Sequence, residues 1–247
     1  GRFVRRDLFK GKGWWNFLIP VDINNDGLPD LIAGNQGYNN RLKPTADKPV
    51  KMFVNDFDEN GKKEQLLTYY IGDKEYLFAN KMELEKQLPY LKKKFLFAGD
   101  FAKAEISDII QQNKLDQSAQ FVVDNFTSGY LVNKGNWNFE WQSLPWEIQL
   151  SPLKTCLPFD VNKDGWMDLI VGGNFYAHSI QMGRNDALPG AVLINEAGKG
   201  FRYQPWSTLV QGEIRRIKPL TVNGEPSLLV ARNNDSLKLF KILDRKP

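Results

Sequence analysis

The chain has 247 residues, of which 42% are hydrophobic and 25% are charged, and its formal net charge is +4 at pH 7. These values are typical of an ordinary soluble globular protein that can bury a real core. No apolar run approaches a membrane-spanning length and no RNP-type or zinc-finger pattern occurs, so a transmembrane segment and a nucleic-acid partner are both disfavoured.

The N-terminal part of the chain predicts a strand, an acidic loop and a second strand. The strand-like sequence WWNFLIPV (14–21) is followed by DINNDGLPD (22–30) and by the apolar run LIAGN (31–35). A further strand is expected in KMFVND (51–56), and the acidic pattern recurs less clearly in DFDENGKKE (56–64). Short strands separated by polar turns indicate an all-β protein.

One region interrupts this β pattern. Between residues 80 and 112 apolar residues recur at helical spacing, at Leu84, Leu88, Leu91 and Phe95. Pro89 is expected to kink or restart this helix, and Asp100 is expected to cap a second helix over 101–112. We expect a small helical insertion between repeated β units, which either covers one face or is an excursion packed on the side.

The second half of the chain repeats the first. LKTCLPF (153–159), DVNKDGWMD (160–168) and LIVGGN (169–174) reproduce the order of strand, acidic loop and apolar run. The strands expected in GYLVNK (129–134) and AVLINE (191–196) both continue through a glycine turn into an aromatic strand.

The final segment, residues 214–242, predicts another strand meander, and its Asn-Gly-Glu turn has too few acids to hold a metal. Together the repeats predict an all-β, propeller-like array of four-stranded blades, with about four blade units visible. We expect residues 1–247 to form one such domain, either a small or open array by itself or a part of a larger propeller.

The acidic loops carry oxygen ligands at alternate positions, which is the chemistry of a calcium site. Calcium takes roughly six to eight oxygens from carboxylates, amides and backbone carbonyls. The expected ligands are Asp22, Asn24, Asp26, Asp30 and the carbonyl of Leu28 in the first loop; Asp56, Asp58, Asn60, Glu64 and the carbonyl of Lys62 in the middle loop; and Asp160, Asn162, Asp164, Asp168 and the carbonyl of Trp166 in the last loop. We expect two calcium sites and a weaker third in the middle loop, where an amide replaces one acid and two lysines are present.

Two alternatives to these calcium sites are an EF-hand and a metal-free turn. An EF-hand needs a bidentate glutamate at position 12, but the three loops have Ala33, Leu67 and Val171 there. The remaining alternative is a set of Asx-type hairpin turns without a metal. Three carboxylates in one turn repel each other unless a cation neutralises them, which favours the metal sites.

The pattern D-x-[DN]-x-[DN]-G-x-x-[DE], followed by LIAGN or LIVGGN and by VLINEAGKGF, resembles the FG-GAP/VCBS repeats of calcium-binding β-propellers. The nearest resemblance is to bacterial proteins of the ASPIC/UnbV and cartilage-acidic-protein-like group. The resemblance covers most of the chain outside the helical insertion. It implies structural calcium within each blade and an extracytoplasmic location, in the periplasm, at the cell surface or secreted. It does not imply one particular activity.

The long loops that follow the two glycine-asparagine strands are the candidate ligand-binding surface. Tyr38 and Arg41 lie in the first loop, and Tyr176, Arg184 and Asp186 lie in the second. Long irregular loops on a rigid scaffold often carry binding sites. The favoured alternative is that the arginine–aspartate pairs only staple the loops.

No catalytic constellation is visible, since His178 is the only histidine and no nucleophile elbow or phosphate-binding loop occurs. The function expected is a calcium-stabilised binding or interaction module that recognises a protein or a glycan through loops on one face. The alternatives are an enzyme or enzyme-accessory domain acting on extracellular glycans or other polymers, and a purely structural role.

Overall fold

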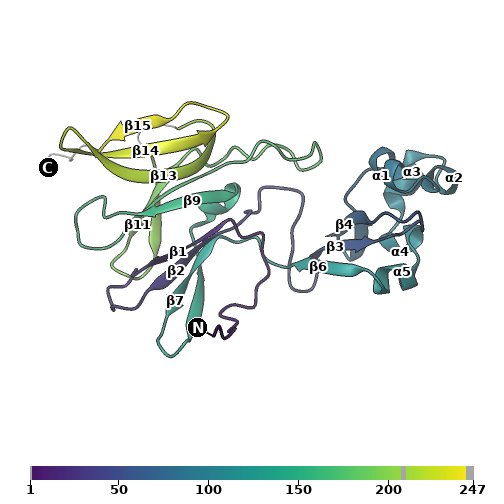
Figure 1. Cartoon of the computed structure of the whole chain (residues 1–247), viewed down its shortest axis with the longest axis horizontal. Coiled ribbons are helices and arrows are strands. Elements are labelled where there is room, and N and C mark those ends of the chain that lie inside the picture. The colour runs from purple at the N-terminus through teal and green to yellow at the C-terminus, as the bar shows by residue number, and fades with distance from the viewer. Residues whose placement is uncertain (1, 207–209, 243–247) are drawn as a thin grey trace. The chain divides into compact units, whose positions relative to one another are not determined.

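The computed structural model describes residues 2–206 and 210–242, which form four antiparallel sheets (Figure 1). Three of the sheets have four strands and one has three. The expected all-β class is therefore confirmed. The sheets of these described residues do not form a closed ring of blades.

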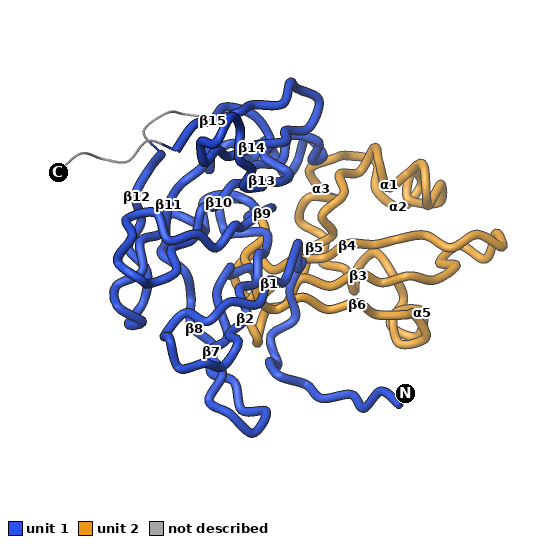
Figure 2. The backbone as a smooth tube through the Cα atoms, turned by 60° about the vertical axis from the view of Figure 1, so that its left-hand side comes forward, with its two compact units in different colours: residues 1–40, 126–247 blue, residues 41–125 orange. Residues whose placement is uncertain are grey.

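The chain divides into two compact units (Figure 2). Unit 1 comprises residues 1–40 and 126–247, and unit 2 comprises residues 41–125. Unit 2 enters the chain between β2 (Asp30–Gly34) and β7 (Gly129–Asn133), which are hydrogen-bonded neighbours in one sheet. The sequence predicts one domain with a helical insertion at about 80–112, whereas the inserted segment in the structure is longer and has a sheet of its own.

Two sheets of unit 1 have the same design. The first has the order β1-β2-β7-β8, with β1 (Phe17–Val21) and β8 (Phe139–Ser143) at its edges. The second comprises β9 (Leu153–Pro158), β10 (Leu169–Gly173), β11 (Ala191–Asn195) and β12 (Phe201–Pro205), in sequential order. In both sheets an acidic loop joins the first two strands, and a long connection separates the second strand from the third. Unit 2 occupies in the first sheet the place that residues 174–190 occupy in the second.

The third sheet of unit 1 is the strand meander expected at the end of the chain. It consists of β13 (Glu213–Val222), β14 (Glu225–Asn233) and β15 (Lys238–Lys241). Asn223 and Gly224 join β13 to β14 with φ of 51° and 82°. Both values are those of a type I′ hairpin turn, whose twist matches that of the flanking strands.

The core of unit 1 lies between its successive sheets. Every residue of β10 is buried, because both faces of this strand are covered. Leu169 and Val171 belong to a cluster shared with the first sheet, while Ile170 packs against Ile214 and other residues of the third sheet. Side chains alternate between the faces of a strand, so this central sheet joins its two neighbours into one stack.

Unit 2 packs five short helices with a sheet of order β5-β4-β3-β6. The strands are β3 (Val50–Asn55), β4 (Glu64–Ile71), β5 (Lys74–Leu77) and β6 (Ala119–Val123). The helices are α1 (Lys81–Gln87), α2 (Leu91–Lys94), α3 (Ala98–Lys103), α4 (Ile106–Ile109) and α5 (Gln112–Asp116). Leu84, Leu88 and Leu91, which set the helical spacing in the sequence, are fully buried against Phe53 and Leu66.

The first helix of unit 2 begins at a local capping residue, whereas the second helix expected from the sequence does not form as predicted. Asn80 caps α1, since its side-chain oxygen accepts a hydrogen bond from the backbone N–H of Glu83, and a break before α2 contains Pro89 as expected. The prediction that Asp100 caps a helix over 101–112 is wrong. Asp100 lies in the first turn of α3, whose N-cap is Phe97, and the chain becomes extended again at Ala104.

One short 3-10 helix, Trp146–Leu150, precedes β9 in unit 1. Among residues 2–206 and 210–242, none of the helices has the length and apolar character needed to cross a membrane.

We expect Leu169→Ala to lower the free energy of unfolding by about 2–5 kcal/mol, because Leu169 is 0% exposed at the centre of the unit 1 core. Ile180→Ala is the control, since Ile180 is 99% exposed, and its effect should stay within about 0.5 kcal/mol. Urea denaturation of the two variants measures both values. Equal losses in the two variants would contradict the placement of the core.

Candidate metal sites

The three acidic loops adopt one backbone conformation. In each, the fourth and the sixth residue have left-handed φ values, and the sixth residue is glycine. The φ values are 55° and 82° at Asn25 and Gly27, 62° and 86° at Glu59 and Gly61, and 62° and 87° at Lys163 and Gly165. Since L-residues avoid this region, its recurrence at the same two positions shows that the sequence repeat is also a structural repeat.

The first aspartate of each loop fixes this conformation through hydrogen bonds. In the first loop one oxygen of Asp22 accepts from the backbone N–H of Asp26 at 3.2 Å, and the other accepts from Gly27 at 2.9 Å. The corresponding bonds to Asp160 measure 3.2 and 2.9 Å, and those to Asp56 measure 3.0 and 2.8 Å. Hydrogen bonds from backbone N–H groups to the first aspartate therefore close all three loops.

The last acid of each unit 1 loop ties the loop to the sheet. Asp30 is fully buried, and its two oxygens accept from the backbone N–H groups of Ile23, at 2.9 Å, and Asn133, at 2.7 Å. Burial raises the pKa of the Asp30 carboxyl above its ordinary value, and the negative charges of Asp26 and Asp22 raise it further.

Asp168 repeats this arrangement in the second sheet. It is fully buried and accepts from the backbone N–H groups of Val161, at 3.0 Å, and Asn195, at 2.8 Å. Burial also raises the pKa of its carboxyl, with further contributions from Asp164 and Asp160. A cation in either loop would oppose these shifts, because it would favour the charged carboxylates.

Two asparagines at the ends of β7 and β11 belong to the loops, although the sequence analysis did not select them. The side-chain amide of Asn195 donates to the carbonyl of Ile23 in the first loop, at 2.9 Å, and to that of Met167 in the second, at 3.1 Å. Asn133 donates to the carbonyl of Pro29 at 3.0 Å. The available signal was the asparagine that closes both GYLVN and AVLIN.

The first and last loops also touch each other directly. The side-chain amide of Asn25 donates to the carbonyl of Gly165 at 3.1 Å. Together with the two bonds of Asn195, this contact makes the two loops of unit 1 a single linked structure.

The middle loop, in unit 2, brings its acids closest together. Asp56, Asp58 and Glu64 each offer an oxygen within 4.8 Å of the other two, and no other such group occurs among the described residues. Oxygens bound to one calcium ion at roughly 2.4 Å lie at most about 5 Å apart. The sequence had ranked this loop as the weakest of the three, whereas its acids are the best gathered.

The difference follows from the strand beside the loop. One oxygen of Glu64 accepts from the backbone N–H of Phe57 at 2.9 Å, as Asp30 does from Ile23. In unit 1, Asn133 at the end of β7 donates to the second oxygen of Asp30. The strand in the corresponding position of unit 2 is β5, but its pairing with β4 ends at Thr68, before Glu64. No residue of β5 therefore donates to the second oxygen of Glu64. The longer glutamate side chain can therefore turn this oxygen toward the other acids.

The residues proposed for ligand binding in the long loops have mainly local partners. The guanidinium of Arg184 lies 3.7 Å from the ring centroid of Tyr176, and its Nε lies 3.3 Å from an oxygen of Asp186. The hydroxyl of Tyr38 accepts from the backbone N–H of Phe126 at 3.2 Å.

Arg41 lies in unit 2, where it donates to the hydroxyl of Tyr69 at 2.7 Å. The structure therefore gathers Tyr176, Arg184 and Asp186 as a local staple, and it places Tyr38 and Arg41 in separate units.

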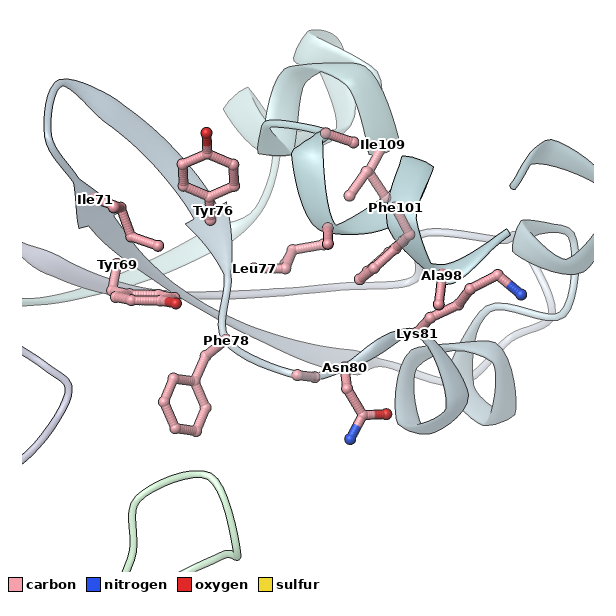
Figure 3. Close-up of a pocket in the computed structure, with 13 residues that line it drawn as sticks. Tyr69, Ile71, Tyr76, Leu77, Phe78, Asn80, Lys81, Ala98, Phe101 and Ile109 are labelled. Carbon is pink, nitrogen blue, oxygen red and sulfur yellow. The ribbon is translucent and has the colours of Figure 1, made fainter. Parts of the chain in front are cut away.

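Unit 2 contains a cavity of about 310 Å³ between its β4–β5 hairpin and its helices (Figure 3). Leu77 and Phe101 point toward each other in its interior, whereas the hydroxyl of Tyr76 and the ammonium of Lys81 point away (Figure 3). Its remaining walls include Tyr69, Phe78 and Ile109. Such a lining suits an apolar group and offers no set of ligands for an ion.

A second cavity of unit 2, of about 420 Å³, adjoins the middle acidic loop and includes Asp58, Glu59, Tyr90 and Lys114 in its walls. Lys114 donates to the carbonyl of Phe57 at 2.7 Å and pairs with Glu59 at 2.9 Å. This lysine therefore supports the loop from outside the acidic group.

Comparisons of the chain with models of protein families, with characterised proteins and with solved structures found no match.

We expect Gly61→Ala to destabilise the protein by about 1–2 kcal/mol, because φ of 86° forces an L-residue into the left-handed region. No atom lies within 4 Å of the added methyl carbon, so the loss measures backbone strain alone. Gly99→Ala in α3 is the control in the same unit. It also has open space but no positive φ, and it should be neutral or stabilising by about 0.5–1 kcal/mol. Thermal denaturation compares the two, and a stable Gly61→Ala protein would contradict the loop conformation.

Proposed function

We propose that the three acidic loops bind calcium and that the protein is a calcium-stabilised binding module of the FG-GAP/VCBS type. In this proposal its successive sheets are blades of a propeller-like array, and it works outside the cytoplasm, where it recognises a protein or a glycan. The observation that carries the proposal is the recurrence of one loop conformation, with the same hydrogen bonds, at the three places where the acidic pattern recurs.

The ligand atoms available in the loops suit calcium. Carboxylate and amide oxygens and a backbone carbonyl are the ligands of a hard cation, and no histidine or cysteine lies within the loops. The middle loop supplies Asp56, Asp58 and Glu64 within the span that one ion covers. In the other two loops the first three ligand residues are half-buried or exposed, namely Asp22, Asn24 and Asp26 and their counterparts Asp160, Asn162 and Asp164, while the buried ninth residue supports the loop.

The placement of the loops supports a stabilising role for calcium. The loop at 22–30 precedes β2 and the loop at 160–168 precedes β10, while the long connections follow the other ends of these strands. Each strand has five residues, a length of roughly 17 Å. Calcium would thus fix the hairpins at one end of the sheets, and the ligand would bind to the loops at the other end.

Calcium should raise the melting temperature of the metal-stripped protein, and magnesium should raise it less. Binding to the folded state alone adds about 2.7 kcal/mol per site when calcium is present at a hundredfold excess over Kd. A thermal melt with and without millimolar calcium measures this effect.

The matched variants are Asp160→Asn and Asp7→Asn. Asp160→Asn removes a charge and keeps one of the two oxygens that accept the loop hydrogen bonds, and it should lose about one site's share of the calcium shift. Asp7 is exposed and pairs with Arg5, outside the acidic loops, so its variant should keep the full shift. An unchanged melting temperature in calcium for the parent protein would refute the metal sites.

A further inference from the structure

Two cationic side chains meet around one aromatic ring at the end of the unit 1 sheets that is opposite the acidic loops. The ammonium of Lys154 lies 4.9 Å from the ring centroid of Phe175, and the guanidinium of Arg215 lies 5.2 Å from it. Lys154 comes from the start of β9, Phe175 follows β10, and Arg215 lies near the start of β13. The stacking of the second and third sheets brings these three elements together.

Lys154 is half-buried and has no acidic partner in the described part of the chain. Its ammonium donates to the side-chain oxygen of Asn16 at 2.8 Å, and no ion pair joins it to a described carboxylate. Asn16 is itself held, because its amide donates to the carbonyls of Asn35 and Leu153, both at 3.1 Å. Burial lowers the pKa of Lys154 and the charge of Arg215 lowers it further, while the charge of Glu213 opposes both effects. A half-buried ammonium that is hydrogen-bonded to a neutral oxygen keeps hydrogens that an anionic ligand can accept.

One acidic residue lies in this group, and its carboxylate oxygens already accept hydrogen bonds from other partners. Glu213 is buried and accepts from Arg215 at 3.0 Å, from the side-chain amide of Asn233 at 2.7 Å and from the backbone N–H of Tyr176 at 2.9 Å. Glu213 pairs directly with Arg215, and its negative charge also acts on Lys154 without a direct ion pair, so two cations share this one acid.

The remaining neighbour, His178, adds no further positive charge to the group. Its ring lies 4.5 Å from that of Phe175, and its Nε2 lies 3.1 Å from the side-chain amide nitrogen of the buried Gln36. Burial lowers the pKa of this imidazole, as does the charge of Lys154, so that it accepts the amide hydrogen as a neutral ring. Gln36 also donates to Asn185 at 3.4 Å, which fixes the back of the site.

We propose that Lys154 and Arg215, placed around Phe175, form a binding site for an oxyanion, namely the carboxylate or phosphate group of a ligand. The ammonium has hydrogens that Asn16 does not use, and the guanidinium has N–H groups that Glu213 does not use, so each keeps donors for an anion held beside the Phe175 ring. The inference rests on the proposed binding role of this end of unit 1, to which it adds the chemistry of the ligand. It does not depend on calcium.

Calorimetric titration of the metal-free full chain with three probes tests the site. Trigalacturonate supplies carboxylates, sodium phosphate supplies a phosphate group, and galactotriose is the neutral control. Binding of either anion without binding of galactotriose is expected, and which anion binds distinguishes a carboxylate from a phosphate source. Failure of both anions, or equal binding of galactotriose, would overturn the proposal.

Matched variants locate the binding. Lys154→Met and Arg215→Gln should each weaken binding of the anion by about tenfold or more, since each removes a charge-assisted donor. The controls Lys218→Met and Arg216→Gln remove exposed charges of β13, the strand that also carries Arg215. They should change the affinity by less than about twofold. Equal effects of the test and control variants would refute the site.

A wild-type measurement covers the case in which a variant does not fold. Addition of phosphate or trigalacturonate should shift the amide resonances of Phe175 and Ile214, and shifts confined to other residues would overturn the proposal. Repeating the titration in calcium separates the two proposals. Anion binding without a calcium-induced rise in melting temperature would leave this site standing while the metal sites failed.

Discussion

The buried carboxylate at the end of each unit 1 loop is the interaction on which the surrounding structure depends. A carboxylate removed from water carries a large desolvation cost, which hydrogen bonds from the protein must offset. Asp30 takes one bond from its own loop and one from β7, and Asp168 takes its second bond from β11. Each acid therefore binds the end of the third strand of its sheet to the loop between the first two strands. This contact couples formation of the hairpin to formation of the rest of the sheet.

This arrangement also explains why two asparagines accompany the acids. The backbone N–H of Asn195 binds Asp168, while its side chain reaches carbonyls of both unit 1 loops. Polar groups of a loop that lies between sheets need partners from the protein, because water does not reach all of them. A single residue at the end of β11 supplies several, and it links one sheet to the next.

Much of the fold could be predicted from the sequence because its signals are local. The acidic loops, the strands around them and the Asn223-Gly224 turn depend on side chains and glycines that lie within a few residues of one another. The extent of unit 2 could not be predicted in this way. Its β6 returns to pair with β3 from more than sixty residues away, and no local pattern specifies such a pairing.

The candidate sites likewise combine features that the local sequence predicts with features that depend on contacts between distant segments. The ligand positions of the loops follow from spacing, but the better gathering of Asp56, Asp58 and Glu64 depends on β5 stopping short of Glu64. Likewise, Lys154 and Arg215 are distant in sequence and carry no motif, and they meet at Phe175 only because sheets stack. The loop arginine that did stand out, Arg184, is occupied by Tyr176 and Asp186.

The insertion of unit 2 between two paired strands has a consequence for the order of folding. During synthesis β1 and β2 emerge first, but β7 and β8, which complete their sheet, follow only after residues 41–125. The backbone bond between Gly37 and Phe126, at 2.9 Å, brings the two ends of this segment together. Closing a long loop costs conformational entropy, and a segment that has already folded with adjacent ends reduces that cost. Unit 2 would then act as an internal folding aid, whose completion on the ribosome sets the moment at which the first sheet of unit 1 can close.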